Sequence, residues 1–207
     1  MTLFIINILV YICFIIYQVV KYKKRKNNIY NEIAISMFLL TLACIFALTG
    51  ISPLSGLKLR QHGVFNIIPS HGVGIIMRSP DTFFKIKNIF GNIIMFVPIG
   101  FLLPTIWIRY RDLYKTTLFG MFLSLSIEVM QMPLARGTDI DDIILNTLGV
   151  VLGYGIYIMT VGRNEKYITI FEDNKRLYSP TKLTLKYLLS IIAVGFIILI
   201  KGMFFNE

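Results

Sequence analysis

The sequence has few acidic residues, few histidines and almost no cysteine. Of its 207 residues, 11 are Asp or Glu, 2 are His and 2 are Cys. Cys13 and Cys44 each lie alone in an apolar stretch, without a CxxC pattern or a ligand partner. Their spacing therefore predicts no metal site, and we expect both thiols to be buried and inert.

The motifs of common enzyme and metal sites are also absent. His62 and His71 are nine residues apart in a glycine-rich stretch, which does not match the i, i+4 spacing of a helical zinc site, so we interpret them as ordinary loop histidines. There is no GxSxG motif, no nucleophile paired with a base, and no phosphate-binding glycine loop ahead of a helix. The sequence thus specifies no cofactor and no metal.

Hydrophobic residues dominate what is present. They make up 56% of the chain against 15% charged residues, and the mean hydropathy is +0.70, which is typical of a polytopic membrane protein. About 20 helical residues cross a hydrocarbon core of roughly 30 Å. Stretches of suitable length predict an all-α transmembrane helical bundle of about six spans, near residues 3–20, 33–52, 89–108, 113–131, 140–161 and 184–202. With no repeat or linker, residues 1–207 read as a single integral-membrane domain.

The distribution of positive charge predicts the orientation. "KYKKRK" at 21–26 follows the first span, an order opposite to that of a cleavable signal peptide, so the N-terminus is expected outside. This orientation places 14 of the 21 Lys and Arg residues on the cytoplasmic side of a multi-pass cell-membrane protein. The net charge of +10 then reflects topology and contact with anionic lipid, and nucleic acid is not expected as a partner.

The longest connection, residues 51–87, contains three prolines and four glycines and is predicted to be non-helical and outside. Its segment "VFNIIP" at 64–69 is apolar enough to enter the membrane interface.

The third, fourth and fifth predicted spans bring polar residues to the same outer boundary of the membrane. With helices starting near Asn88 and Ile140, Asn92 lies about 6 Å and Asn146 about 9 Å below the start of its own helix.

The polar residues also share helix faces, because successive helical residues turn by about 100°. Ser124, Glu128 and Gln131 fall within an arc of about 60°. In the following helix Asp141 points away from an arc of roughly 80° that contains Asp139, Asp142, Asn146, Gly149 and Gly153. The last two form a GxxxG pair, which permits close approach of a neighbouring backbone. The arcs predict that the carboxylates face protein.

Two explanations account for this polarity in a membrane. In the structural one, Arg136 in the turn pairs with Glu128, Asp139 or Asp142, the amides of Gln131, Asn146 and Asn92 satisfy helix ends, and Asp139 caps the following helix. In the functional one, the same carboxylates and Arg136 line an outward-facing pocket for a ligand, since ionisable groups inside a membrane commonly mark functional sites. The sequence leaves both open.

Two segments resemble the VanZ-like family of bacterial membrane proteins. They are "GNIIMFVPIGFLLP" at 91–104 and "SIEVMQMPLARGTDIDDIILNTLGVVLG" at 126–153, with "FNIIP" ahead of them. The resemblance covers a core of about 64–157 and implies a membrane fold, together with an association with low-level resistance to teicoplanin-type glycopeptides. The family pattern falls on Asn92, Pro98, Gly100, Glu128, Gln131, Arg136, Asp139, Asp142, Asn146, Gly149 and Gly153.

We expect a binding protein that engages an amphiphile, a glycopeptide or a lipid-linked cell-envelope molecule at the outer face of the membrane. The alternative is a hydrolase or transferase acting on a lipid-linked substrate, with Glu128 and Asp142 as general acid and base. A transporter is less favoured because the inner halves of the spans lack polar residues. Oxygen ligands of this kind also suit Mg²⁺ or Ca²⁺, although no pattern requires a cation.

Overall fold

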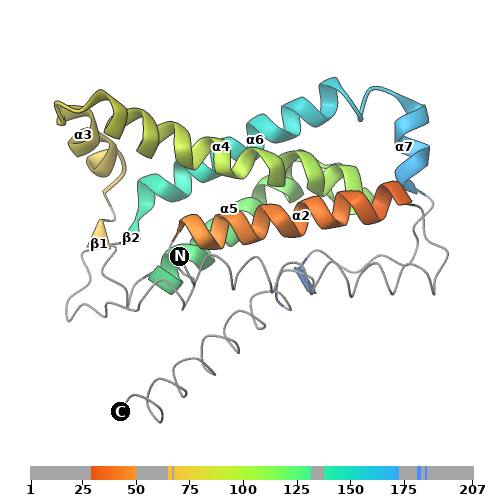
Figure 1. Cartoon of the computed structure of the whole chain (residues 1–207), viewed down its shortest axis with the longest axis horizontal. Coiled ribbons are helices and arrows are strands. Elements are labelled where there is room, and N and C mark those ends of the chain that lie inside the picture. Colours follow the sequence, from red (N-terminus) through yellow and green to blue (C-terminus); the bar gives the residue numbers. More distant parts are fainter. Residues whose placement is uncertain are drawn as a thin grey trace, which may run out of the picture.

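Long helices lying side by side form the structure (Figure 1). The computed structural model describes residues 29–49, 65–66, 68–131, 138–172, 181–182 and 185. The helices are α2 (Ile29–Leu48), α3 (His71–Arg78), α4 (Thr82–Ile106), η1 (Ile108–Tyr110), α5 (Leu113–Gln131), α6 (Ile140–Met159) and α7 (Glu165–Glu172). Two short strands, β1 (Phe65–Asn66) and β2 (Thr138–Asp139), form one parallel pair. The helical class is thus confirmed for the described residues.

Three of the described helices are long and apolar enough to cross a membrane. They are Tyr30–Leu48 with 19 residues, Thr82–Ile106 with 25 and Ile140–Met159 with 20. Helix α5 coincides with the span predicted at 113–131 but is not among the three. The spans predicted at 3–20 and 184–202 lie outside the described residues, apart from Leu185. These apolar helices indicate a membrane protein.

The prediction that residues 51–87 form a non-helical connection is wrong over two stretches. Helix α3 occupies 71–78, so His71 begins a helix, while His62 lies outside the described residues. Helix α4 begins at Thr82 because the Asp81 carboxylate accepts hydrogen bonds from Phe83 N at 2.8 Å and Phe84 N at 3.1 Å. Asn92 therefore lies about 15 Å along its helix, and not the 6 Å predicted.

The buried core lies where α2 packs against α4. Phe38, Leu39 and Leu42 of α2 are completely buried together with Phe96 and Leu103 of α4. The Phe38 and Trp107 rings meet edge to face, with centroids 5.2 Å apart. This packing fixes α2 along the second half of α4.

Cys44 contradicts the expectation of a buried thiol. It lies on an exposed part of α2, and Cys13 lies outside the described residues. Apolar residues occur on all sides of α2, so the hydrophobic pattern alone does not tell which of its residues face protein. In a membrane the remaining apolar surface faces lipid.

Helices α4 and α6 make the most extensive contact in the described structure. Gly149 lies against the carbonyl of Ile93, and Gly153 lies against the carbonyl of Val97. Gly100 of α4 lies in the same way against the carbonyl of Val150. A Cβ atom at any of these three glycines would lie 2.0 to 2.1 Å from that carbonyl oxygen, so only glycine permits this separation.

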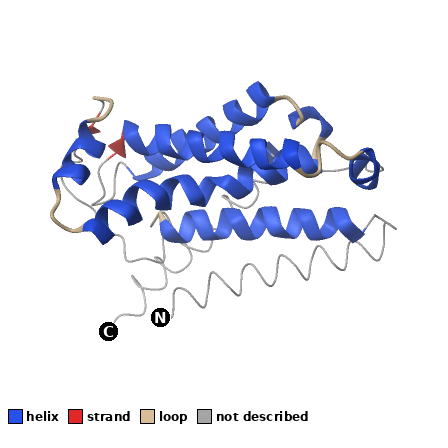
Figure 2. Cartoon of the chain, turned by 90° about the horizontal axis from the view of Figure 1, so that it is seen from above, coloured by secondary structure: helices blue, strands red, loops and turns tan. Residues whose placement is uncertain are grey.

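This close packing also positions the ends of the bundle. Pro98 lies inside α4 beside this contact, half-buried, where it removes one backbone N–H without ending the helix. Since α4 and α6 run in the same direction, their N-termini lie at the same end as α3, β1 and β2, with α7 at the opposite end (Figures 1 and 2). The short strand pair therefore lies beside the start of α6.

We expect Gly153→Ala to lower the free energy of unfolding by about 1–3 kcal/mol, because the new methyl group overlaps the backbone of α4. Gly155→Ala is the matched control on the same helix, since nothing lies within 4 Å of a Cβ there. Because alanine favours helix over glycine by up to about 1 kcal/mol, this control should be neutral or stabilising. Unfolding in detergent followed by circular dichroism measures both, and equal stabilities would contradict the α4–α6 contact.

Candidate functional site

Polar side chains from several segments meet at the end of the bundle where α6 begins. Helix α5 contributes its last turn, α4 one amide, and β1, β2 and the first turns of α6 the rest. Helix α3 covers this end from the side (Figure 1). We call the following residues the polar cluster: Asn66, Asn92, Glu128, Gln131, Asp139, Asp141, Asp142 and Asn146.

Glu128 is the most deeply placed acid of the cluster, with only 2% of its surface exposed. Its Oε2 accepts a hydrogen bond from the backbone N–H of Asp139 at 3.0 Å. The carboxylate from the C-terminal turn of α5 therefore lies against the start of α6, where a helix N-terminus favours negative charge. This contact joins the two arms of the predicted helical hairpin.

Asp139 caps α6, as predicted. Its Oδ1 accepts the backbone N–H of Asp141 at 2.9 Å and the side-chain amide of Asn66 at 3.0 Å. The parallel pairing of Asn66 with Asp139 brings these two side chains together. Gly72 of α3 lies so close that a Cβ there would be 2.0 Å from the other oxygen of Asp139. The segment that contains β1 and the start of α3, more than 60 residues earlier in the chain, therefore packs against Asp139.

Asp141, predicted to point away from the arc that contains Asp139 and Asp142, nevertheless takes part in the polar contacts at this end of the bundle. Asp141 is 4% exposed, and its two oxygens accept the backbone N–H groups of Ser70 at 2.6 Å and Val73 at 2.8 Å. Ser70, at a φ of 68°, precedes α3 and makes no side-chain cap of its own. Asp141 therefore supplies the cap of α3 from another helix. The helical arc did not include Asp141 because it was calculated for one helix alone, without the contact that α3 makes.

Three side-chain amides link the long helices. Asn92 of α4 donates to Oδ1 of the half-buried Asp142. The Asn146 amide donates to the Ser124 hydroxyl at 2.9 Å, and that of Gln131 donates to the Thr49 carbonyl at 2.7 Å. The cluster consequently connects α4, α5 and α6 to one another and to the end of α2.

One buried acceptor is left over at the centre of these contacts. Asn146 is 2% exposed, and its Oδ1 has no hydrogen-bond partner in the structure. A buried polar atom without a partner is destabilising by about 1–3 kcal/mol, so natural structures contain few of them. Within the described residues the Asn146 oxygen is one of a few such atoms, the side chain of Asn31 in α2 being another case, and it is the one that lies inside the polar cluster.

Arg136 lies outside the described residues, in the turn at 132–137. Its pairing with Glu128, Asp139 or Asp142 stays a prediction. Among the described residues, no three His, Cys, Asp or Glu side chains are grouped to hold a metal ion.

The sequence interpretation missed the contribution of the connection before α4. Asn66, Gly72 and the backbone of Ser70 and Val73 all belong to the site. The apolar "FNIIP" element that contains Asn66 was the available signal. Its role became visible only through its pairing with β2.

We expect Asp141→Asn to loosen α3, because hydrogen bonds to a charged acceptor contribute about 1.5–3 kcal/mol and the amide can accept with only one oxygen. Amide hydrogen exchange across residues 70–78 should become roughly tenfold faster. The control is Asp112→Asn, which replaces an exposed acid at the start of α5. It should leave the exchange of residues 70–78 unchanged. Unaltered exchange in Asp141→Asn would refute the anchoring role.

Comparison with known proteins identifies the family of the chain. The VanZ/LLP1 family model matches residues 33–161, which include most of α2 and the whole polar cluster. The chain is 31% identical over 98 residues to Protein VanZ of Enterococcus faecium, an alignment that covers 47% of this chain and 60% of that protein. No solved structure matches the chain significantly. Since the family match extends over more than half of its length, the chain belongs to the VanZ/LLP1 family.

Proposed function

We propose that this protein is a multi-pass cell-membrane protein whose polar cluster engages an amphiphile, a glycopeptide or a lipid-linked cell-envelope molecule at the outer face. By this interaction it contributes to low-level resistance to teicoplanin-type glycopeptides, the association that resemblance to the VanZ-like family implies. Asn92, Glu128, Gln131, Asp139, Asp142 and Asn146, with Arg136 from the adjoining turn, are the proposed ligand-binding residues.

The buried Oδ1 of Asn146 is the observation that carries this proposal. Oxygens of Glu128, Asp139 and Asp141 accept hydrogen bonds from the chain itself, whereas this one has no partner. Charged groups within a membrane also cost about 2.5–3.5 kcal/mol each on insertion scales at the helix centre. Four carboxylates lie at this one end of the bundle, in a chain that has only 11 Asp and Glu residues. This number exceeds what the helix caps there require.

The proposed topology has six spans and an external N-terminus. Helix α5 has 19 residues and is therefore about 28 Å long, close to the roughly 30 Å of a hydrocarbon core. Its start, near Arg109 and Lys115, then lies on the cytoplasmic side, and its last turn with Glu128 lies on the outer side. Arginine binds carboxylates with two parallel hydrogen bonds, so Arg136 suits an anionic group of the ligand.

A hydrolase or transferase is the less favoured function. Glu128 is bonded to the backbone of Asp139, and Asp142 is bonded to Asn92. Each candidate catalytic carboxylate is thus held by a different element of the chain. A general acid and base need to share access to a reacting group, whereas these hydrogen bonds hold the two acids on different elements.

The functional test is Glu128→Gln in a strain whose teicoplanin tolerance depends on this protein. Glutamine keeps the shape and one acceptor oxygen for the Asp139 N–H, so the variant should reach the membrane at normal levels. Loss of the negative charge should lower the minimal inhibitory concentration to that of cells without the protein.

Glu165→Gln is the matched control, because Glu165 is exposed at the start of α7 at the opposite end of the bundle. It should leave tolerance unchanged. Normal tolerance in Glu128→Gln would contradict the proposal. Loss of the folded protein from the membrane would instead assign Glu128 a purely structural role.

The orientation can be tested with single cysteines in a chain whose two native cysteines are replaced by alanine, which matters because Cys44 is exposed. A cysteine at Gly137 should react with an impermeant maleimide in intact cells. A cysteine at Asn164, exposed between α6 and α7, should react only after permeabilisation. The reverse pattern would invert the proposed topology.

A further inference from the structure

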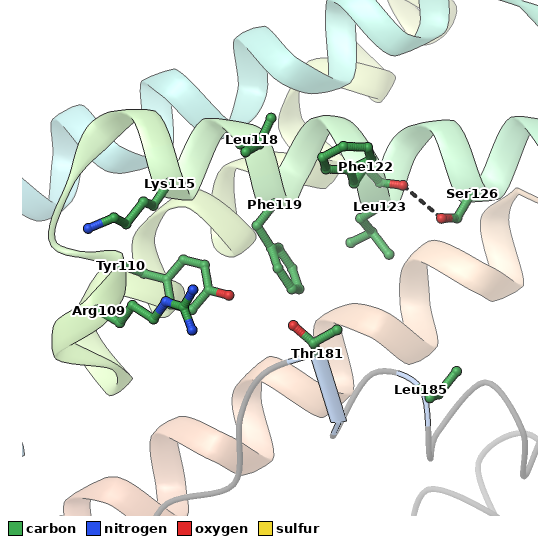
Figure 3. A pocket seen from close by; sticks show the side chains of 10 residues that line it. All are labelled: Arg109, Tyr110, Lys115, Leu118, Phe119, Phe122, Leu123, Ser126, Thr181 and Leu185. Atoms are coloured by element: carbon green, nitrogen blue, oxygen red, sulfur yellow. Dashed lines mark hydrogen bonds between the residues drawn. The ribbon is translucent and has the colours of Figure 1, made fainter.

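A pocket of about 410 Å³ lies along α5 and extends from η1 to Ser126 (Figure 3). Residues of η1 and the first four turns of α5 form one side, and Thr181 and Leu185 form the other. Its volume falls within the range of about 300–1,000 Å³ typical of small-molecule sites. The family resemblance and the proposed function assign nothing to it.

Most of the pocket wall is apolar. The Phe119 ring points into it and packs edge to face on Tyr110, with ring centroids 5.6 Å apart. The Ser126 hydroxyl at the far end donates to the Phe122 carbonyl at 2.7 Å, so its proton is already used. This part of the pocket suits a hydrocarbon.

The other end of the pocket is cationic. Arg109 and Lys115 are both exposed and lie together there, away from Ser126 (Figure 3). None of the described residues that line the pocket is acidic. The nearest acid in the sequence, Asp112, caps α5 by accepting the backbone N–H of Lys115 at 2.9 Å. This end of the pocket is therefore positively charged, with the Arg109 guanidinium turned toward Tyr110 and the Lys115 amine pointing outward at the rim (Figure 3).

The length of the pocket fits one membrane leaflet. From Lys115 to Ser126 the helix advances by about 16 Å, and half of a hydrocarbon core is about 15 Å. Basic residues at the membrane boundary, followed by an apolar groove of this depth, match the shape of a phospholipid. A soluble anion would leave the apolar wall unused, and a zwitterionic lipid would bring a further cationic group close to Arg109 and Lys115.

We propose that this pocket binds an anionic phospholipid, with its phosphate between Arg109 and Lys115 and one acyl chain along α5 toward Ser126. The bound lipid fills the space between α5 and the residues Thr181 and Leu185. The pocket shares no lining residue with the polar cluster, so this inference does not depend on the proposed ligand of the cluster.

Native mass spectrometry of the full chain in detergent tests the proposal, with phosphatidylglycerol and phosphatidylcholine of identical acyl chains as probes. The protein should retain phosphatidylglycerol preferentially. Each basic residue near anionic lipid contributes about fivefold to the affinity, so Arg109→Gln with Lys115→Gln should reduce this preference by about 25-fold. Arg163→Gln with Lys166→Gln removes two exposed cations elsewhere on the chain and should have no such effect.

A second variant tests the pocket itself. Ser126→Phe fills the apolar end and leaves both cations in place, and it should reduce retention of either lipid by about tenfold or more, because burial of an acyl chain contributes most of the affinity. Monodisperse elution of each variant shows that it remains folded. Equal retention of the two lipids by the unaltered protein would overturn the proposal, as would normal binding in Ser126→Phe, which would indicate only surface attraction.

Discussion

The close approach of α4 and α6 is the constraint on which the rest of the structure depends. Gly100, Gly149 and Gly153 let the two backbones touch, so the helices are held in a fixed register along most of their length. Without side chains between them, neither helix can slide or rotate without a steric clash. The position of every residue that α4 and α6 carry toward the site follows from this contact.

The register explains how the polar cluster forms. It places Asn92, which lies well inside α4, next to Asp142 in the first turn of α6. It also fixes the N-terminus of α6, to which Glu128 from α5 and the capping residue Asp139 are bonded. The short strand pair and α3 then attach to this end through Asn66 and Asp141. Rigid packing in the middle of the bundle thus supports polar contacts at its end.

The bundle has chemically different ends. One end concentrates carboxylates and amides around α6, with a buried acceptor on Asn146 that lacks a partner. The other end carries Arg109 and Lys115 beside an apolar pocket. Helix α5 connects them over about the thickness of a hydrocarbon core. This arrangement supports the proposed division between ligand recognition on the outer side and lipid contact on the cytoplasmic side.

Composition and periodicity determined the helical class, the position of most long helices, and the residues of α5 and α6 that face protein. These features are local, because 1.5 Å per residue and 3.6 residues per turn fix depth and direction within one helix. Tertiary structure alone decided that α3 and β1 pack on the start of α6, which brought Asp141 and Asn66 into the site. It also decided that Cys44 is exposed. The sequence determined which residues lie on each face of a helix. Contacts between segments up to 82 residues apart decided what those faces pack against, since no local pattern encodes the partner.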